Sequence, residues 1–439
     1  MRHLILTTEP LPLPGLPATG AGLRAWALFR GLQSAGVGEV AVAFAADAIR
    51  GRSVDRSAWP EGVRTFERSG LAAFIADLAP DTVILQHWGL GRDLPEIAQP
   101  LAVDLAGPHL LERCLWGSRH RESDLAEKLA VLRRADHVVC SGEYQRRYFL
   151  GFLAMAGWDM ANGDLCPAIA FSVDPDLAPP NDDRDGAHLV LGGFFLPWQD
   201  PSWAIETTLE IMDEAGAGHL TIIGGAHPSG DVSAGRHDAL LERLKSHSRV
   251  TLRGPMAFDD YARELTRFGA ALDLMPRNPE RELAFPTRTV QYLAAGLPVL
   301  HNDYDELAPA IAEAQAGWAL RPGDREGLAR ALRTILTDRD ERERRADNTR
   351  RLVRERYSWD RTIEPLAAWC RNPERRPAAA APGPAAAGPE VMNPEPESKP
   401  RRRSVAGLLM GLAVAPMALG VAGVLAISSL LRGRSKVGR

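Results

Sequence analysis

The sequence predicts an α/β fold of two doubly wound, Rossmann-like domains that face a cleft, followed by a C-terminal transmembrane helix. Short apolar runs alternate with helical stretches through residues 1–371, as in parallel sheets whose two faces are covered by helices. A break containing Pro, Asn and Asp at residues 175–186 divides these runs into two sets. Residues 404–431 are apolar and carry no charge. Together these observations give the predicted architecture.

Ten strands are expected, in two sets of five, at residues 3–7, 40–44, 82–86, 102–105 and 137–140, and then at 189–191, 220–223, 250–252, 271–275 and 298–301. We place the first domain at residues 1–175 and the second at residues 187–371. Ligands of doubly wound sheets bind beyond the carboxyl ends of the strands. We therefore expect the functional site between the two domains.

Composition excludes several classes of protein. The chain has 439 residues, of which 45% are hydrophobic and 25% charged, so it is not a disordered chain, a collagen or a polytopic membrane protein. The net charge of −4 gives no bulk attraction to nucleic acid, and the charge run at residues 338–356 has the mixed signs of a solvated helix face. None of the four cysteines stands at zinc-binding spacing.

The end of the chain has a different composition. Residues 372–403 are rich in Pro, Ala and Glu at first and end in three arginines, which predicts a disordered linker. The apolar segment at 404–431 would make about 42 Å of helix, against a hydrocarbon core of about 30 Å. A buried core helix is the alternative, but the length and the basic flanks favour a membrane anchor. Gly407 and Gly411 form a GxxxG pattern that is suited to pairing with another helix.

The first candidate ligand loop is glycine-rich. Gly20 and Gly22 open a predicted helix shortly after the first strand. Glycines let the backbone approach a ligand, and a helix N-terminus offers free N–H groups to an anion. A plain turn is the alternative interpretation.

A second glycine pair ends the first strand of the second domain. Gly192 and Gly193 are followed by a long loop that carries Trp198 and Asp200. We expect this loop to face a ligand, with Trp198 stacking on a base or a sugar ring. A tryptophan in the hydrophobic core is the alternative.

The third motif is a loop, a short helix and a buried strand within residues 280–300. The helix is expected to begin near Thr287 and to end at Gly296. Its N-terminus, with Arg288 and the hydroxyls of Thr287 and Thr289, would hold a phosphate group. A purely structural helix–Gly–strand unit is the alternative.

The segment FPTRTVQYLAAGLPVL, at residues 285–300, resembles the donor site of group-1, family-4-like glycosyltransferases of GT-B architecture, especially a bacterial polysaccharide or glycolipid type. Four further segments match this subgroup in order, at residues 103–112, 135–146, 192–201 and 224–228. The resemblance covers about residues 1–365. It implies transfer of a sugar from a nucleotide-sugar to an acceptor, without a bound metal or other cofactor, and with retention at the anomeric carbon.

The resemblance also implies roles for individual residues. The diphosphate would be contacted by Arg288 and Thr289, the ribose by Gln291, and the sugar by Glu280 or Glu282. The loop from Gly193 to Asp200 would shape the donor pocket, while Gly20 and Gly22 would approach the diphosphate or the acceptor from the other domain.

Two features depart from the broad family pattern. The broad family usually has two glutamates eight positions apart, the E-x7-E pattern. Here the first of these positions is Leu283 and the second is Gln291. The usual lysine of the glycine loop is absent, and Asp200 lies in that neighbourhood. Arg253, Arg277 or Arg281 would have to supply the missing charge.

On the acceptor side, His87 at a strand end is a candidate base or a group that holds a hydroxyl. His109 and Asp104 are its rivals for a catalytic role. Residues 303–305 superficially match a DxD metal motif, but they follow a buried strand and we predict no metal site there.

These inferences predict a single-pass glycosyltransferase of the inner or plasma membrane, with its catalytic part in the cytoplasm. Its partners would be a nucleotide-sugar donor, a polysaccharide or lipid-linked acceptor and the membrane, but no nucleic acid. A sugar-nucleotide epimerase on the same fold and a non-catalytic, membrane-tethered sugar-nucleotide-binding protein are the alternatives.

Overall fold

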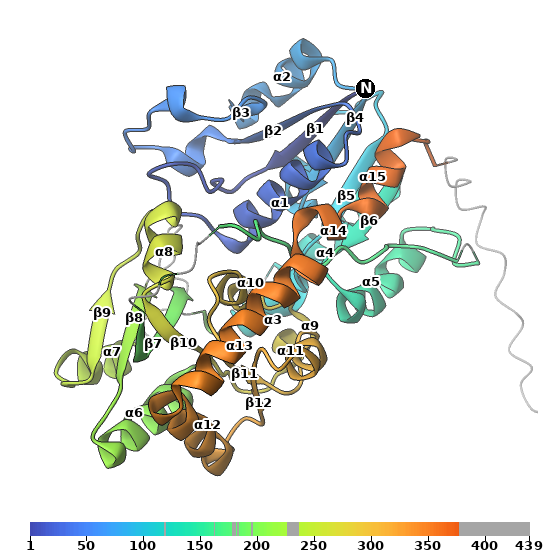
Figure 1. Cartoon of the computed structure of the whole chain (residues 1–439). Coiled ribbons are helices and arrows are strands. Elements are labelled where there is room, and N and C mark those ends of the chain that lie inside the picture. The colour runs from blue at the N-terminus through green and yellow to red at the C-terminus, as the bar shows by residue number, and fades with distance from the viewer. Residues whose placement is uncertain are drawn as a thin grey trace, which may run out of the picture. The chain divides into compact units, whose positions relative to one another are not determined.

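The computed structural model describes residues 1–117, 120–161, 163–177, 181, 184–194, 196–225 and 237–376 (Figure 1). These residues belong to one compact unit, Met1–Ala381. The predicted linker beyond residue 376 and the predicted transmembrane helix at 404–431, with its GxxxG pattern, lie outside the described residues. Within the described part, no helix is both long enough and apolar enough to cross a bilayer.

The first half of the unit is built on a parallel six-stranded sheet with the order β3-β2-β1-β4-β5-β6. Its strands are β1 (Arg2–Thr7), β2 (Glu39–Ala45), β3 (Val63–Phe66), β4 (Thr82–Gln86), β5 (Leu101–Leu105) and β6 (His137–Cys140). The helices of this half are α1 (Gly20–Ser34), α2 (Leu71–Leu78), α3 (His109–Leu115), α4 (Arg121–Arg134) and α5 (Glu143–Met155).

The second half repeats this plan with the order β12-β11-β10-β7-β8-β9, again with parallel pairing. Its strands are β7 (Asp185–Phe194), β8 (His219–Gly225), β9 (Val250–Arg253), β10 (Phe268–Asp273), β11 (Val299–Asn302) and β12 (Gly317–Leu320). Its helices are α6 (Ser202–Ala215), α7 (Asp238–Lys245), α8 (Phe258–Leu265), α9 (Pro279–Leu283), α10 (Thr287–Ala294), α11 (Ala308–Ala314), α12 (Arg325–Thr337) and α13 (Arg339–Leu352).

The prediction of five strands in each half is wrong by one strand in each described sheet. The strands it misses, β3 and β12, are four residues long and lie at sheet edges. Arg64 is exposed in the middle of β3, and Ala319 is exposed in β12. Because an edge strand is less completely covered than a central one, its sequence lacks the continuous apolar run by which the central strands were found.

Both faces of each sheet are buried, which is what fixes the doubly wound arrangement. In β1, Leu4 and Leu6 belong to one hydrophobic cluster and Ile5 to another on the opposite face. In β7, Leu189 packs on one face and Val190 on the other. Each such side chain contributes about 1.5–3 kcal/mol on burial. The predicted fold of two parallel-sheet α/β domains is confirmed.

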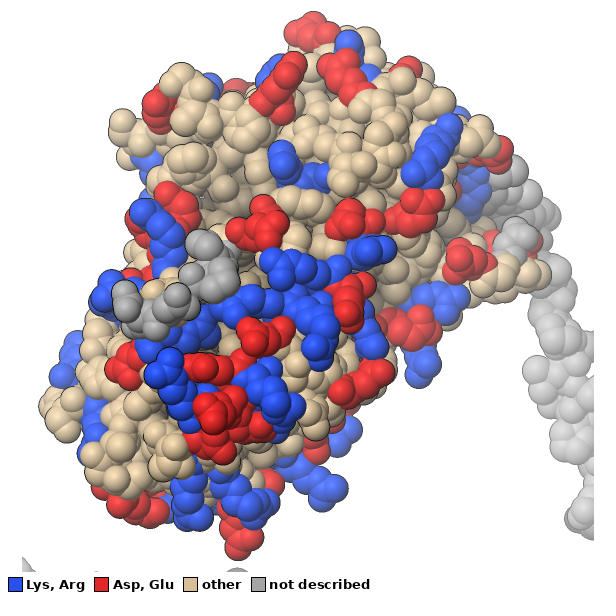
Figure 2. All heavy atoms as spheres, in the orientation of Figure 1, with Lys and Arg blue, Asp and Glu red and all other residues tan. Residues whose placement is uncertain are grey.

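The surface of α13 carries interspersed acidic and basic side chains (Figure 2). Glu341 accepts from Arg344 at 2.7 Å and from Arg345 at 2.8 Å, one turn further along the helix. Such pairs contribute only a few tenths of a kcal/mol each. They give α13 the mixed-charge outer face that the sequence predicts.

After α13 the chain returns to the first sheet through α14 (Trp359–Thr362) and α15 (Glu364–Arg371), shown in orange beside α1 in Figure 1. Ile363, between these helices, is 2% exposed and packs in the same cluster as Ile5. A Cβ built on Gly31 of α1 would lie 2.8 Å from Ile363, so this contact requires glycine. The Trp369 ring stacks on His137 with centroids 5.4 Å apart.

We predict that Ile363→Ala lowers the free energy of unfolding by about 2–4 kcal/mol, because it leaves a cavity beside α1. Urea denaturation of the full chain measures the change. Arg361→Ala, at an exposed position two residues away, is the matched control and is expected to change stability little. Equal effects of the two substitutions would contradict the proposed docking.

His137 gives this docking a pH dependence. Burial lowers the pKa of His137 to about 4, and its Nε2 has no hydrogen-bond partner among the described residues. Since the unfolded chain binds this proton near pH 6.5, stability is highest above that pH and falls as pH drops toward 4. Between about pH 7 and pH 4, the wild type should lose about 2 kcal/mol more than His137→Phe, measured by urea denaturation at each pH. If the wild type and His137→Phe lose the same free energy of unfolding over this pH range, His137 is hydrated in the folded protein and the prediction is wrong.

Candidate active site

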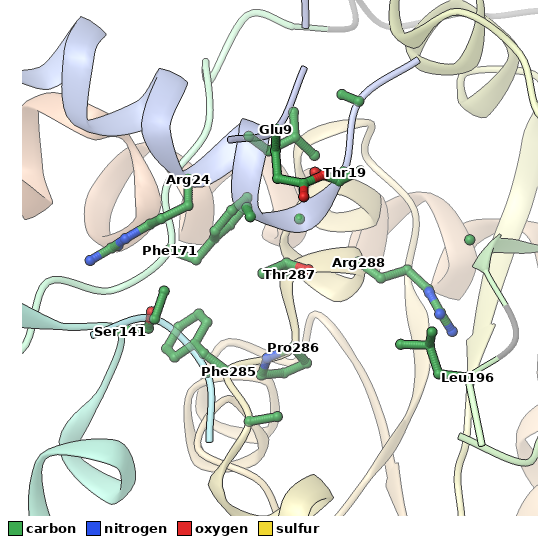
Figure 3. A pocket seen from close by; sticks show the side chains of 18 of the residues that line it. Glu9, Thr19, Arg24, Ser141, Phe171, Leu196, Phe285, Pro286, Thr287 and Arg288 are labelled. Atoms are coloured by element: carbon green, nitrogen blue, oxygen red, sulfur yellow. The ribbon is translucent and has the colours of Figure 1, made fainter. Parts of the chain in front are cut away.

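A cavity of about 520 Å³ lies at the carboxyl ends of both sheets (Figure 3). Residues that follow strands of the first sheet form one wall, and residues at the strand ends of the second sheet form the other. The lining includes Thr8, Gln86, His87, Gly107 and Ser141 from the first half, and Gly193, Gly224, Asp273, Thr287 and Arg288 from the second. The cavity therefore stands where doubly wound sheets bind ligands.

Two helix N-termini meet across this cavity. Gly20 opens α1, and Thr287 opens α10. A Cβ built on Gly20 would lie 3.5 Å from the Thr287 hydroxyl oxygen, which puts the two helix ends in direct apposition. The residue before α10 is Pro286, whose side chain makes no capping bond, so the first N–H groups of α10 remain available. Two positive dipole ends that converge on one cavity are suited to an anion.

Arg288 adds a full positive charge beside these helix ends. Its guanidinium donates to the Asp273 carboxylate at 3.3 Å and to the Gln199 side-chain oxygen at 3.1 Å. It also lies over Gly193, whose φ is 111° and whose added Cβ would stand 2.8 Å from the Arg288 Nε. Figure 3 shows Arg288 directed toward Leu196 of the glycine loop. The cation that the loop itself lacks is thus supplied by α10.

Asp273 is a residue that the sequence reasoning missed. It ends β10, and its second oxygen accepts from the Thr289 hydroxyl at 2.6 Å. One carboxylate therefore holds both Arg288 and Thr289. A carboxylate at the end of an otherwise apolar strand was the signal that could have identified it.

Thr289 does not line the cavity, which corrects its predicted contact with a diphosphate. It is completely buried against Asp273. Residues two apart on a helix point about 200° apart, so Thr287 and Thr289 cannot both face the same ligand.

Gly192 is also a structural residue rather than a lining one. Its N–H donates to the Tyr292 hydroxyl at 2.6 Å, and an added Cβ would lie 2.3 Å from the Tyr261 hydroxyl. Burial raises the pKa of Tyr261 to about 12, so this hydroxyl stays protonated. The two tyrosines fix the end of β7, from which Gly193 reaches the cavity.

Glu280 and Trp198 form another part of the cavity wall. Arg281 donates to Glu280 at 2.6 and 2.8 Å. Burial nevertheless raises the pKa of Glu280 above its ordinary value. Asn278 caps α9 and binds the Trp198 carbonyl at 2.9 Å, which fixes the tryptophan loop against the helix that carries Glu280.

Four other predicted site residues lie away from the cavity. Glu282 pairs with Arg277 on the exposed side of α9. The Asp200 carboxylate accepts from the Ser202 N–H at 3.0 Å, at the start of α6. Arg253 pairs with Glu264 at 2.9 Å. Gly22 packs inside the first domain, where an added Cβ would lie 1.9 Å from the Pro10 oxygen.

Asp104 is not a catalytic group. It is fully buried and holds Arg24 through two bonds of 2.9 and 3.0 Å. Arg24 also donates to the Ile169 carbonyl at 2.7 Å and is directed away from Thr287 in Figure 3. A buried pair of this kind positions α1 against the sheet, and removing one partner would leave an uncompensated charge.

His87 lines the cavity with an unusual backbone φ of 80°. Its Nδ1 accepts from the Gly89 N–H at 3.0 Å, and its ring stands 4.9 Å from that of His109. Burial, with charge repulsion from His109 and Lys128, holds the pKa of His87 well below its ordinary value. Neutral His87 therefore carries its proton on Nε2, so it can donate to a hydroxyl but is not placed to act as a base.

The DxD-like segment has protein partners at both carboxylates. Asp305 is buried and bonds His301 at 2.8 Å, while Asp303 pairs with Arg321 at 3.5 Å. Among the described residues there is no group of three or more side chains that could hold a metal ion.

Comparisons with known proteins agree with the fold. Residues 206–368 match the model of a family described as glycosyl transferase-like. Over this segment the chain is similar to glycosyltransferases. No curated protein sequence matches it. The group-1 GT-B resemblance that the sequence predicted is confirmed.

Solved structures share the fold of this chain at low sequence identity. Sucrose-phosphate synthase from Thermosynechococcus elongatus is 16% identical with a TM-score of 0.62, over 84% of this chain and 98% of that one. Anabaena HepE, in complex with UDP and glucose, is 15% identical with a TM-score of 0.59 and the same coverage. Trehalose-6-phosphate synthase OtsA is 10% identical with a TM-score of 0.62, over 86% of this chain and 100% of that one.

We predict opposite behaviour for the two threonines of α10. Thr289→Val leaves one oxygen of the buried Asp273 without its donor and should lower the free energy of unfolding by about 1–3 kcal/mol. Thr287→Val, at the cavity surface, should change it by less than about 0.5 kcal/mol. Chemical denaturation of the two variants decides this. Equal stability losses would contradict the assignment of Thr289 as a structural residue.

Proposed function

We propose that this glycosyltransferase takes a sugar from a nucleotide-sugar and transfers it to a polysaccharide or lipid-linked acceptor of the cell surface. The single observation that carries the donor half of this proposal is the apposition of Gly20 and Thr287 across the cavity. The diphosphate would lie alongside the facing N-termini of α1 and α10, with Arg288 beside it. The likeness to HepE, which was solved with UDP and glucose, makes UDP-sugars the first donors to test.

The nucleoside would occupy the part of the cavity next to Gln291. The Gln291 amide N–H donates to the Thr287 carbonyl at 3.3 Å, which leaves its side-chain oxygen to accept from a ribose hydroxyl. An uncharged amide performs this task where the broad family has a glutamate. Trp198, which also lines the cavity, offers an apolar surface for a base or for the sugar.

The transferred sugar would lie between Glu280 and His87. Glu280 is held by Arg281 and would accept from a sugar hydroxyl. His87 would donate from Nε2 to another hydroxyl, because its Nδ1 is engaged with Gly89. Hydroxyl groups held at both ends fix the anomeric carbon relative to the leaving group.

The reaction requires stabilisation of the negative charge that develops on the departing diphosphate. We assign this role to Arg288 and to the N–H groups at the start of α10, without a metal ion or another cofactor. The Asp273 carboxylate keeps Arg288 in place before the donor arrives. We propose that the sugar is transferred with retention, as the family implies.

Membrane anchoring remains a proposal that rests on the sequence. Residues 404–431 would form a single span at the inner or plasma membrane, with the catalytic part in the cytoplasm and Gly407 and Gly411 available for helix pairing. Tethering raises the effective concentration of an enzyme for an acceptor that lies in the bilayer. No specific observation favours an epimerase or a non-catalytic binding protein.

The direct test is UDP binding by the full chain in a neutral detergent. Arg288→Ala should weaken UDP binding by about 1.5–3 kcal/mol, because it removes a charge-assisted contact. Arg253→Ala is the matched control, since this arginine is in the same domain but pairs with Glu264 outside the cavity. Isothermal titration calorimetry gives both affinities.

Unchanged UDP affinity in a folded Arg288→Ala variant would refute the donor site. Release of UDP from a panel of UDP-sugars, with and without lipid acceptors, then tests turnover. Binding without turnover under every condition would favour the non-catalytic alternative.

A further inference from the structure

A second cavity, of about 290 Å³, lies at the same edge of the first sheet as the active site. It is lined by residues that follow β2 and by Glu67, which follows β3. In the sheet order, β2 is the direct neighbour of β1, whose carboxyl end carries Thr8 and Glu9 of the active-site wall. The two cavities therefore open along one sheet edge.

Three arginines dominate the ionisable lining of this second cavity: Arg50, Arg52 and Arg56. None of them pairs with a carboxylate of the described residues. Arg68 nearby shows the contrast, because it holds Asp47 at 2.9 Å and Asp93 at 3.1 Å. Arg68 shares its single positive charge between two carboxylates. Even when Asp47 and Glu67 are both counted against the three arginines, the lining keeps an excess of positive charge.

The loop that carries these arginines is fixed at both ends. Ile49 is buried in the core directly after β2. Trp59 packs on Phe44 with ring centroids 5.6 Å apart, and the Arg56 guanidinium lies 5.4 Å from the Trp59 ring centre. Between these points, the Asp55 carboxylate accepts from the Ser57 N–H at 2.9 Å. The arginines are therefore presented by an anchored loop.

We propose that the arginine cavity, formed by Arg50, Arg52 and Arg56, binds a phosphoryl group of the acceptor. That the ligand is the acceptor rests on the proposed function, whereas the binding of a phosphoryl group does not. Guanidinium groups match phosphate oxygens in geometry and are more weakly hydrated than an ammonium group. The cavity has about ten times the volume of one water molecule in the liquid, which suits a phosphoryl group with part of its substituent.

An acceptor that carries such a group would place it on the arginines and extend along the sheet edge from β2 to β1. Its reactive hydroxyl would then reach the cleft near Glu9 and the end of α1. The same chemistry could come from a soluble sugar phosphate or from a lipid phosphate, and the experiment separates these two sources.

The test compares the full-length wild type with Arg50→Gln/Arg52→Gln/Arg56→Gln in a neutral detergent. Two probes are titrated: glycerol 3-phosphate, and the same detergent micelles doped with phosphatidylglycerol. Saturating UDP is present throughout to fill the donor site. The matched control, Arg321→Gln/Arg330→Gln/Arg333→Gln, removes the same charge from exposed positions in the second domain.

We expect the arginine-cavity variant to bind at least one probe about tenfold more weakly than the wild type, and the control to bind like the wild type. Weaker binding of glycerol 3-phosphate alone identifies a soluble phosphate, and weaker binding of the doped micelles alone identifies a lipid phosphate. Equal affinity of the wild type and the folded cavity variant for both probes overturns the proposal.

UDP affinity, measured separately for the same three proteins before the phosphate probes and saturating UDP are added, separates this proposal from the donor site. It should be the same in all three proteins. If none of them binds UDP, the proposed function fails, while the comparison of the phosphate probes still decides whether the arginine cavity is a phosphoryl site.

Discussion

The structure depends on the meeting of two helix N-termini, one from each parallel sheet. Gly20 stands opposite Thr287, where an added Cβ would lie 3.5 Å from the Thr287 hydroxyl oxygen, and each helix begins directly after a loop at the carboxyl edge of its sheet. The two helix ends create positive potential without a net charge on the backbone, although Thr19 caps the Gly22 N–H of α1. The rest of the cavity extends this site toward a nucleoside on one side and toward a sugar on the other.

A single buried carboxylate keeps the site in order before any ligand binds. Asp273 holds both Arg288 and Thr289, so the start of α10 and its cation are fixed to the end of β10. The return of the chain through α14 and α15 then ties the second domain to the first, with Ile363 packed against Gly31. Glu306 adds a further contact, because its carboxylate accepts from the N–H groups of Glu143 at 2.6 Å and Tyr144 at 3.2 Å.

The sequence was sufficient to predict the two parallel domains and the segment that begins α10. It was less informative about which side chains of that segment face the cavity. Alternation along a strand separates Gly193 from Gly192, and rotation along a helix separates Thr287 from Thr289. The buried partner of Asp104 stands far away in the chain, so its structural role could not be read from the strand alone. Long-range pairs of this kind are set by tertiary structure and leave no local pattern.

The most direct test of the account is a crystal structure of the protein with UDP. The account predicts that the β-phosphate lies within hydrogen-bond distance of the backbone N–H groups at the start of α10, facing Gly20. A β-phosphate bound elsewhere, with the start of α10 left unoccupied, would contradict it.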